Sequence, residues 1–291
     1  MKKFMSDKSV FEYQAGTYRL PMGARTYVMG IINVTPDSFS DGGRYFSVDK
    51  AEQYAMRLIE DQADMLDIGG ESTRPGHTPV SKEEEIARVV PVIRRIAPAV
   101  GVPISVDTSK SQVAFLAVEA GASIINDIWG LRRDSDIARV GFDTKAGLVL
   151  MFNATDPSLI ENSGDIVADA ITYLSMSIEI ALRAGVSENQ IMLDPGIGFG
   201  MDHRQSYELI KGIGRIKELG FPVLIGPSRK RFIGAALGNI PVERRDTGTA
   251  AVSCIAAYLG ADAVRVHDVK KVVQSLIISD ILSDKRKYEE V

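Results

Sequence analysis

The sequence is poor in the residues that build disulfide frameworks and thiolate metal clusters. It has one cysteine, Cys254, so an intrachain disulfide and a zinc cluster made of thiolates are both excluded. Cys254 lies in the apolar run 252–256, and we expect it to be a small buried hydrophobic residue. With only three histidines as well, the chemistry of this chain must rest mainly on carboxylates, amides and cations.

Long hydrophobic runs are also missing. No stretch reaches the roughly 18 apolar residues of a transmembrane helix, and the first residues lack the apolar core of a signal peptide. The net charge of −4 and the pI of ≈ 5.6 give no reason to expect a nucleic acid or an anionic membrane as partner. We expect a soluble cytoplasmic protein in which local cations hold any anionic substrate.

What the sequence does contain is a repeated order of a short apolar run, a polar or glycine-rich end, and an amphipathic stretch. The runs predict eight strands, at 27–33, 65–69, 104–107, 123–127, 147–151, 191–194, 223–226 and 263–267. The intervals between them are long enough for crossover helices, which parallel strands require. The 291 residues suit one (β/α)8 barrel, a fold that typically takes about 250 residues.

Local signals support helices between these strands. Asp49 with Glu52, and Ser81 with Glu84, have the spacing of a capping box. A glycine follows each of three further helical stretches and is a natural stop. These stretches are 111–120, 170–184 and 247–259.

The main alternative architecture is an open, doubly wound sheet. A dinucleotide-binding sheet of that kind needs G-x-G-x-x-G after its first strand, but this chain continues from Asn33 with V-T-P-D-S. The α/β class with a (β/α)8 TIM barrel is therefore favoured. We expect the barrel at 27–282, an N-terminal segment at 1–26 with a small hairpin that closes the bottom, and a charged tail at 283–291.

Polar residues stand where the predicted strands end, which is where barrels carry their active sites. Carboxylates beside amides suit a flat heterocycle with several N–H donors, and clustered cations beside an asparagine suit a phosphate or pyrophosphate with a metal ion. This pattern indicates a transferase or lyase that acts on a phosphorylated heterocycle. The residues are Asn33, Thr73, Arg74, Asp107, Asn126, Met151, Asp194, Ser228, Arg229, Lys230, Arg265 and His267.

Seven motifs extend this pattern from about residue 27 to 270. They are M-G-I-I-N-V-T-P-D-S-F-S-D-G-G at 29–43, D-I-G-G-E-S-T-R-P-G at 67–76, S-V-D-T at 105–108, I-N-D at 125–127, D-P-G-I-G-F at 194–199, S-R-K at 228–230 and R-V-H-D at 265–268. On these motifs the sequence resembles the bacterial dihydropteroate synthases, a family of pterin-binding TIM barrels.

The resemblance implies a magnesium-dependent condensation in folate biosynthesis. 4-Aminobenzoate displaces pyrophosphate from the methylene of 7,8-dihydropterin-6-ylmethyl diphosphate and gives 7,8-dihydropteroate. The resemblance also implies a homodimer and a target of sulfonamides.

The resemblance further implies roles for residues at the pterin. Asp194, Asp107 and Asn126 would bind its polar edges, Met151 would pack on its face, and Lys230 would bond its carbonyl or ring nitrogen near the reacting methylene. Lys230, Asp107 and Arg265 would be the catalytic residues.

The remaining roles implied by the resemblance concern the other substrate groups. Arg265 and His267 would hold the pyrophosphate, and Asn33 would reach the magnesium ion. The residues around the aminobenzoate would be Thr73, Arg74, Pro75, Ser228 and Arg229, with Phe39 covering them.

The sequence departs from the family after the fifth strand. The family usually has Met-His-Met there, whereas this chain has Met151-Phe152-Asn153. A divergent pterin-binding paralogue is therefore one alternative, although it would be expected to lack Asn33, Lys230 or Arg265. A barrel like the methyltetrahydrofolate methyltransferases is the other alternative, and it would lack the pyrophosphate motifs. All of these residues and motifs are present.

Overall fold

The central feature of the fold is a sheet of eight parallel strands. The computed structural model describes residues 10–35, 48–72, 79–155 and 163–287. The strands have the order β8-β7-β6-β5-β4-β3-β10-β9. Their bounds are β3 (Tyr27–Asn33), β4 (Met65–Gly69), β5 (Ile104–Asp107), β6 (Ile124–Asp127), β7 (Gly147–Met151), β8 (Ile191–Asp194), β9 (Leu224–Ile225) and β10 (Ala263–Val266).

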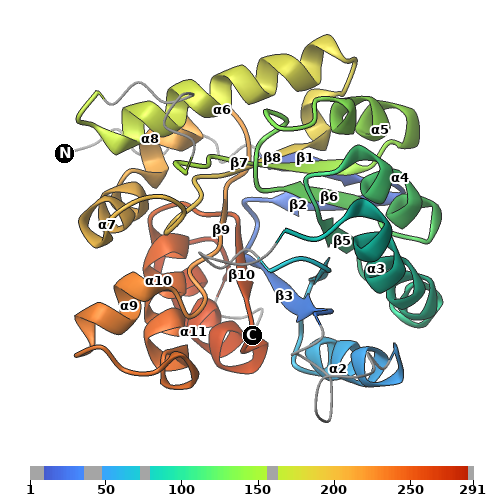
Figure 1. Ribbon diagram of the computed structural model, residues 1–291. Helices are drawn as coiled ribbons and strands as arrows, with labels where there is room; N and C mark the ends of the chain where they lie inside the picture. The colour runs from blue at the N-terminus through green and yellow to red at the C-terminus, as the bar shows by residue number, and fades with distance from the viewer. Residues whose placement is uncertain (1–9, 36–47, 73–78, 156–162, 288–291) are drawn as a thin grey trace.

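A backbone bridge joins the two outer strands of this order. Leu193 of β8 pairs in parallel with Val223, the residue before β9, and its N–H donates to the carbonyl of Pro222 at 2.9 Å. The sheet thus closes on itself, and Figure 1 shows the helices arranged around it. The predicted (β/α)8 barrel is confirmed.

The helices differ from the predicted ones mainly at their ends. Ser81 does cap its helix, since its side chain accepts the N–H of Glu84 at 3.2 Å. Asp49 was wrong as a cap, because α2 begins at Val48 and Asp49 lies inside it. The bounds are α2 (Val48–Glu60), α3 (Lys82–Ile96), α4 (Ser111–Glu119), α5 (Asp136–Thr144), α6 (Ile166–Arg183), α7 (His203–Lys211), α8 (Ile213–Lys217), α9 (Arg231–Ala236), α10 (Asp246–Tyr258) and α11 (Val269–Leu282).

The lower interior of the barrel is apolar. Successive residues of a strand point to opposite faces, so the register of the strands decides which side chains meet inside. Met29 pairs with Met65, and Ile124 pairs with Gly147. The inward side chains of this part form one buried cluster: Tyr27, Met29, Met65, Ile124, Val149, Met192, Leu224 and Ala263.

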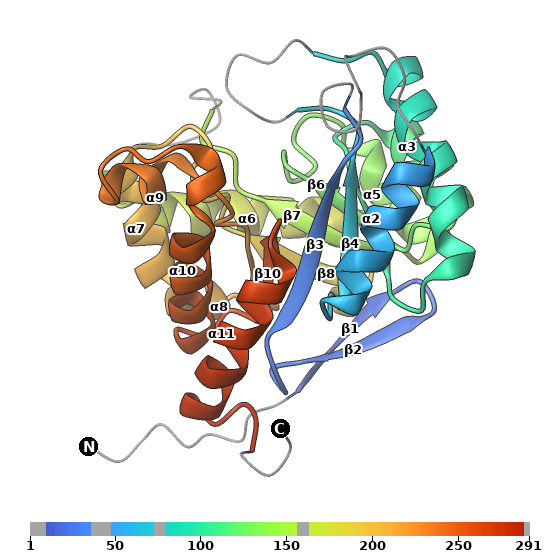
Figure 2. The same cartoon turned by 90° about the horizontal axis from the view of Figure 1, so that it is seen from below.

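A hairpin closes the bottom of the barrel, as predicted. Its strands β1 (Phe11–Ala15) and β2 (Tyr18–Met22) pair in antiparallel fashion, and Figure 2 shows them lying across the end opposite to the one where β3 ends. Tyr13 is fully buried in the lower cluster. A Cβ atom at Gly147 would come within 2.4 Å of the Tyr13 hydroxyl, so β7 begins with a glycine to make room for it.

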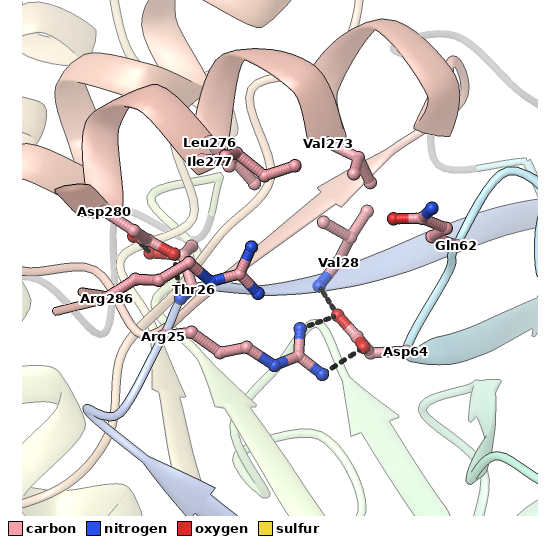
Figure 3. A pocket seen from close by; sticks show the side chains of 10 residues that line it. All are labelled: Arg25, Thr26, Val28, Gln62, Asp64, Val273, Leu276, Ile277, Asp280 and Arg286. Atoms are coloured by element: carbon pink, nitrogen blue, oxygen red, sulfur yellow. Dashed lines mark hydrogen bonds and ion pairs between the residues drawn. The ribbon is translucent and has the colours of Figure 1, made fainter. Parts of the chain in front are cut away.

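Polar contacts fasten the C-terminal helix to the first barrel strand at the same end. Asp280 of α11 accepts hydrogen bonds from the backbone N–H of Thr26 at 2.8 Å and from its hydroxyl at 2.6 Å. Arg25 pairs with Asp64 through two bonds of 2.8 and 2.5 Å. A cavity of about 270 Å³ lies between these groups (Figure 3), and their bonds account for its polar lining. In the described part of the chain, no helix is long and apolar enough to cross a membrane.

The hairpin should contribute strongly to stability. Replacing Tyr13 by alanine removes a fully buried aromatic side chain, so we expect a loss of about 3–5 kcal/mol in the free energy of unfolding. Urea denaturation followed by circular dichroism measures this loss. Glu12→Ala, an exposed change on the same strand, is the control and should stay within about 0.5 kcal/mol. Equal stability of the two variants would contradict a structural role for the hairpin.

Candidate active site

A buried ionic network occupies the upper interior of the barrel. Arg265 of β10 donates from Nε to Oδ2 of Asp67 on β4 at 2.5 Å, and from Nη2 to Oδ2 of Asp107 on β5 at 2.7 Å. Asn126 of β6 donates to the same oxygen of Asp67 at 3.3 Å. Four strands thus bring four polar side chains together directly above the apolar layers.

Burial changes the acid–base behaviour of this network. It raises the pKa of Asp107 to about 7, although the charge of Arg265 works in the opposite direction. Burial alone would lower the pKa of Arg265, but Asp67 and Asp107 outweigh it, and the net change is upward. The guanidinium therefore stays charged, whereas Asp107 titrates near neutral pH.

Asp194 ends β8 beside this network. Its Oδ1 accepts the backbone N–H of Gly196 at 2.7 Å, and burial raises its pKa to about 6. The turn requires glycine at 196, because φ is +64° and a Cβ atom would lie 1.8 Å from the carbonyl oxygen of Phe152. This tight turn fixes the carboxylate at the mouth of the barrel.

Lys230 approaches Asp194 from the neighbouring loop. Its Nζ lies 3.9 Å from the centre of the Phe199 ring, a cation–π contact. Burial lowers the pKa of Lys230 to about 8, against the opposing charge of Asp194. An ammonium with this pKa is still mostly charged at neutral pH.

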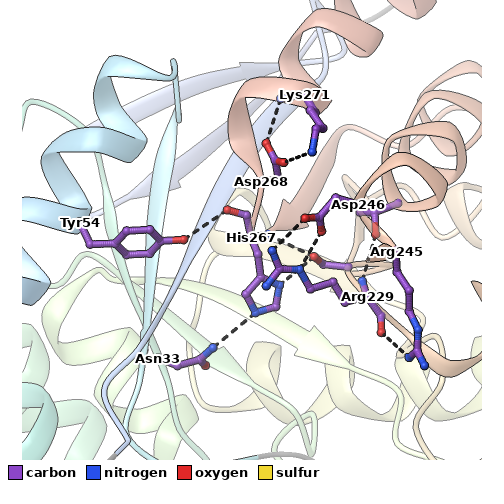
Figure 4. A network of polar contacts seen from close by, with 10 residues as sticks. Asn33, Tyr54, Arg229, Arg245, Asp246, His267, Asp268 and Lys271 are labelled. Carbon is purple, nitrogen blue, oxygen red and sulfur yellow. Dashed lines mark hydrogen bonds and ion pairs between the residues drawn. The ribbon is translucent and has the colours of Figure 1, made fainter. Parts of the chain in front are cut away.

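Helix α10 holds the turn that carries Ser228 and Lys230. Between them, Arg229 has a left-handed backbone with φ +58°. Its N–H donates to the hydroxyl of Thr249 at 3.0 Å, and its carbonyl accepts from Arg245 at 3.0 Å. The Arg229 guanidinium forms a two-bond pair with Asp246 on α10 (Figure 4). Arg229 therefore supports the turn, while its neighbours contact the site.

A second polar group lies at the rim of the barrel. Nδ1 of His267 is 2.8 Å from the Ser228 hydroxyl, and its Nε2 is 3.4 Å from Nδ2 of Asn33. The Ser228 hydroxyl also accepts the backbone N–H of His267 at 3.1 Å, and Tyr54 donates to the His267 carbonyl at 3.3 Å. Figure 4 shows Asn33 and His267 facing each other across the strand ends. The imidazole is thus oriented from both sides.

The departure after the fifth strand lies outside this site. Met151 points inward and is buried beside the turn at Gly196, whereas Phe152, the next residue, points to the helix layer. Phe152 is fully buried, and its ring packs edge-on against the ring of Tyr173 on α6, with 5.3 Å between the two ring centres. Asn153 is also satisfied, since it donates to the carbonyl of Ile128 at 3.0 Å. The residues that replace the family pattern therefore pack the barrel wall.

The expected site residues form an inner group and a rim group in the structure. Arg265 and His267 alternate on one strand, but the Arg265 guanidinium joins Asp67 and Asp107, whereas the His267 ring joins Ser228 and Asn33. Phe39, Thr73, Arg74 and Pro75 lie outside the described residues.

Asp67 belongs to the site by its contacts with Arg265 and Asn126, although the sequence motifs assign it no role. The signal for Asp67 was available, because a charged residue in the middle of a strand is almost never buried without a partner.

Comparison with known proteins agrees with this geometry. The family described as "Pterin binding enzyme" matches residues 29–267. The chain is 49% identical over 261 residues to the dihydropteroate synthase of Bacillus subtilis, which covers 90% of both chains. It is similar to the crystal structure of a Clostridium difficile dihydropteroate synthase in the presence of pteroic acid, with a TM-score of 0.86, 41% identity, and coverage of 90% of this chain and 98% of the other.

A structure that contains 4-aminobenzoic acid is equally similar. The dihydropteroate synthase of Xanthomonas albilineans with 4-aminobenzoic acid has a TM-score of 0.87 and 41% identity, and the match covers 94% of this chain and 98% of that one. The family match, the sequence identity over 90% of the chain and the shared fold all lead to the same assignment. The chain belongs to the dihydropteroate synthase family of pterin-binding enzymes.

Proposed function

We propose that this protein is a transferase that condenses 7,8-dihydropterin-6-ylmethyl diphosphate with 4-aminobenzoate, giving 7,8-dihydropteroate and pyrophosphate in folate biosynthesis. The observation that carries this proposal is the division of the site into two groups. Buried carboxylates and an amide line the barrel interior, while His267, Ser228 and Asn33 line the rim. A heterocycle linked to a diphosphate needs both kinds of surroundings.

The inner group suits the pterin ring. The carboxylate of Asp194 has one oxygen held by Gly196, and its other oxygen makes no hydrogen bond among the described residues. It is suited to accept from the ring N–H and 2-amino groups, with Asp107 and Asn126 at further polar edges. Met151 would pack on the ring face. Lys230 would donate to the ring carbonyl or nitrogen.

The rim group suits the diphosphate. His267 is oriented by Ser228 and stands beside Asn33, so its ring and the Asn33 amide would face the leaving group. Arg265 belongs to the inner group by its contacts with Asp67 and Asp107, and its charge would act near the bond that breaks. Ser228, with Thr73 and Arg74, would complete the surroundings of 4-aminobenzoate.

Magnesium is compatible with this rim. Among residues 10–35, 48–72, 79–155 and 163–287, no cluster of three His, Cys, Asp or Glu side chains is placed to hold a metal. Magnesium commonly uses one or two protein oxygens together with waters and substrate phosphates, and the Asn33 amide oxygen could be such a ligand. When bound, the ion would neutralise charge on the departing pyrophosphate.

We infer that catalysis depends on positioning and charge. Pyrophosphate leaves first, the pterin ring delocalises the positive charge on the methylene, and the amine of 4-aminobenzoate then attacks that carbon. The buried carboxylates would stabilise the cationic ring, and Lys230 would orient it. This sequence of steps requires no nucleophile from the protein.

The activity can be tested directly. The purified protein, supplied with both substrates and magnesium, should release dihydropteroate and pyrophosphate in equal amounts. Lys230→Ala should lower kcat/KM by about 100-fold or more, because it removes a charge-assisted hydrogen bond to the ring. A sulfonamide should compete with 4-aminobenzoate. Pterin binding without turnover, measured by calorimetry, would favour the divergent paralogue instead.

The rate should depend on pH through three buried groups. Burial raises the pKa of Asp194 to about 6 and of Asp107 to about 7, and it lowers the pKa of Lys230 to about 8. Both carboxylates must lose their protons to accept from the pterin, so kcat/KM for the pterin substrate should fall as the pH drops below 7. It should also fall above pH 8, where Lys230 loses its charge. Lys230→Arg should remove the alkaline fall alone, and an alkaline fall unchanged in that variant would contradict the assignment to Lys230.

We propose a homodimer that forms through helices α10 and α11. The α10/α11 apolar face, defined as Ile255, Tyr258, Leu259, Ile278 and Leu282, is exposed, with Tyr258 at 61% and Leu282 at 68%. A hydrogen bond of 2.8 Å from Ser279 to the Cys254 carbonyl holds the two helices together beside this face. Monomers rarely expose a contiguous apolar patch of this kind, so a second copy is the expected cover.

The dimer is tested by mass in solution. Sedimentation equilibrium of the wild type should give twice the chain mass of 31.6 kDa. The double variant Ile255→Glu, Tyr258→Glu should sediment as a monomer, because it buries two carboxylates in an apolar contact. Phe115→Glu changes an exposed aromatic residue on α4 and should leave the dimer intact. A monomeric wild type would contradict the proposal.

We also propose a cytoplasmic location. It is consistent with a chain that has one cysteine and therefore no intrachain disulfide.

A further inference from the structure

Asp67 is less exposed than any other charged residue that the structure describes. It lies in the middle of β4 and has 0% of its surface exposed. Its Oδ2 accepts from both Arg265 Nε at 2.5 Å and Asn126 Nδ2 at 3.3 Å. Asp67 thus contacts two residues of the proposed pterin site without being among the expected ligands itself.

The depth of Asp67 follows from the strand register. Asp67 pairs with Ser105 on β5, and Gly69 pairs with Asp107, so Asp67 lies one inward step below the Asp107 level. It stands between the apolar floor and the inner group. This position separates Asp67 from the ring edges that Asp107 would bind.

Asp67 is only half satisfied at this position. Taking a charge out of water is costly unless every lone pair finds a donor. Asp67 Oδ1 has no hydrogen-bond partner among the described residues, and the same holds for the Oγ of Ser105 beside it on β5. The reason for a carboxylate here must therefore lie in its other oxygen, Oδ2, which pairs with Arg265 and accepts from Asn126.

What Asp67 does is fix one end of a rigid group. The guanidinium is planar, so a short bond at Nε sets the direction of both Nη atoms. With Nε held by Asp67, Nη2 reaches Asp107 at 2.7 Å, and Nη1 makes no hydrogen bond with the described residues. The buried bond leaves Nη1 available to a ligand and keeps the charge at the level of Asp107.

We propose that Asp67 is a positioning residue that anchors Arg265 by its Nε and thereby fixes the guanidinium for the pterin diphosphate. This inference rests on the proposed condensation and deepens it by naming what orients one of its charges. Asp67 acts through Arg265 and Asn126 and touches neither substrate.

The anchor has an electrostatic signature at Asp107. The charged groups that affect the Asp107 carboxyl are Arg265, Asp67, Glu85 and Asp127, with Lys230 also close enough to interact. Asp67, as a negative neighbour, contributes to the raised pKa of Asp107. Asp67→Leu removes both this repulsion and the acceptor for Nε, and it leaves Arg265 paired with Asp107 alone. Both changes lower the pKa of Asp107, so the acid limb of pterin binding should move to lower pH.

The decisive experiment is a double-mutant cycle on binding of the pterin diphosphate without 4-aminobenzoate, followed by calorimetry. Asp67→Leu is close in size but removes the acceptor for Arg265 Nε, and it should weaken binding by about tenfold or more. In an Arg265→Gln background the same change should alter binding by less than about twofold, because the anchored group is gone. Equal factors in both backgrounds would overturn the proposal.

Asp262→Leu is the matched control. Asp262 is also buried, at 2% exposure, and pairs with Lys217 Nζ at 2.8 and 2.6 Å, but it lies at the opposite end of the barrel. It should lose stability as Asp67→Leu does, without a change in pterin affinity or in its pH dependence. If both variants weakened binding equally, the effect of Asp67 would be one of general destabilisation.

A spectroscopic measurement separates this inference from the proposed activity. The Arg265 Nε–H should give a resolved, slowly exchanging signal in nitrogen-edited NMR of the wild type, and Asp67→Leu, which offers no acceptor, should abolish it. A wild type that shows this signal but no turnover would overturn the proposed function and leave the anchor intact. A wild type with turnover and a rapidly exchanging Nε–H would overturn the anchor alone.

Discussion

The site depends on one buried ion-pair network, in which a single guanidinium joins the carboxylates of two adjacent strands. Arg265 sits between Asp67 and Asp107 inside a closed barrel, where charges interact strongly because water is excluded. Removal of any one partner would leave an unpaired charge in an apolar surrounding. Burial in this closed interior raises the pKa of Asp107 although Arg265 opposes the shift, and the two carboxylates fix the location of the guanidinium.

The rest of the barrel excludes water from that network and holds its side chains in place. The lower interior is filled by apolar side chains, and the hairpin buries Tyr13 beneath them. Above the network, the tight turn at Gly196 and the left-handed residue Arg229 present Asp194, Ser228 and Lys230 to the opening. A packed floor and a rim of constrained turns together give a site whose polar groups cannot relax away from a ligand.

The unusual sequence at the end of β7 shows how the alternation of side chains along a strand protects a site from substitutions at neighbouring positions. Met151 faces inward, and Phe152 faces the helices because it is the next residue. The unusual residue is therefore accommodated by contact with Tyr173 and not by the groups that would bind pterin. The family assignment and the altered sequence are compatible for this physical reason.

The sequence by itself determined the architecture, and it named the polar residues that stand at the strand ends. Short apolar runs predicted β3, β4, β5, β7 and β8 at their observed bounds. Strands that are buried on both faces have such runs because both faces need apolar side chains. Since active sites of barrels lie at strand ends, the polar residues there could be named as well.

Only the tertiary structure decided which of these residues meet. The partners of Arg265, the Ser228 contact of His267 and the pair of Arg229 with Asp246 join segments that are far apart in the chain. Their geometry depends on strand register and barrel closure, which local periodicity does not encode. Helix ends were also predicted less well, as at Asp49, because a capping pattern in the sequence does not fix the residue at which a helix begins. Pairing across the barrel is a property of the closed sheet, whereas strand identity is a property of each segment.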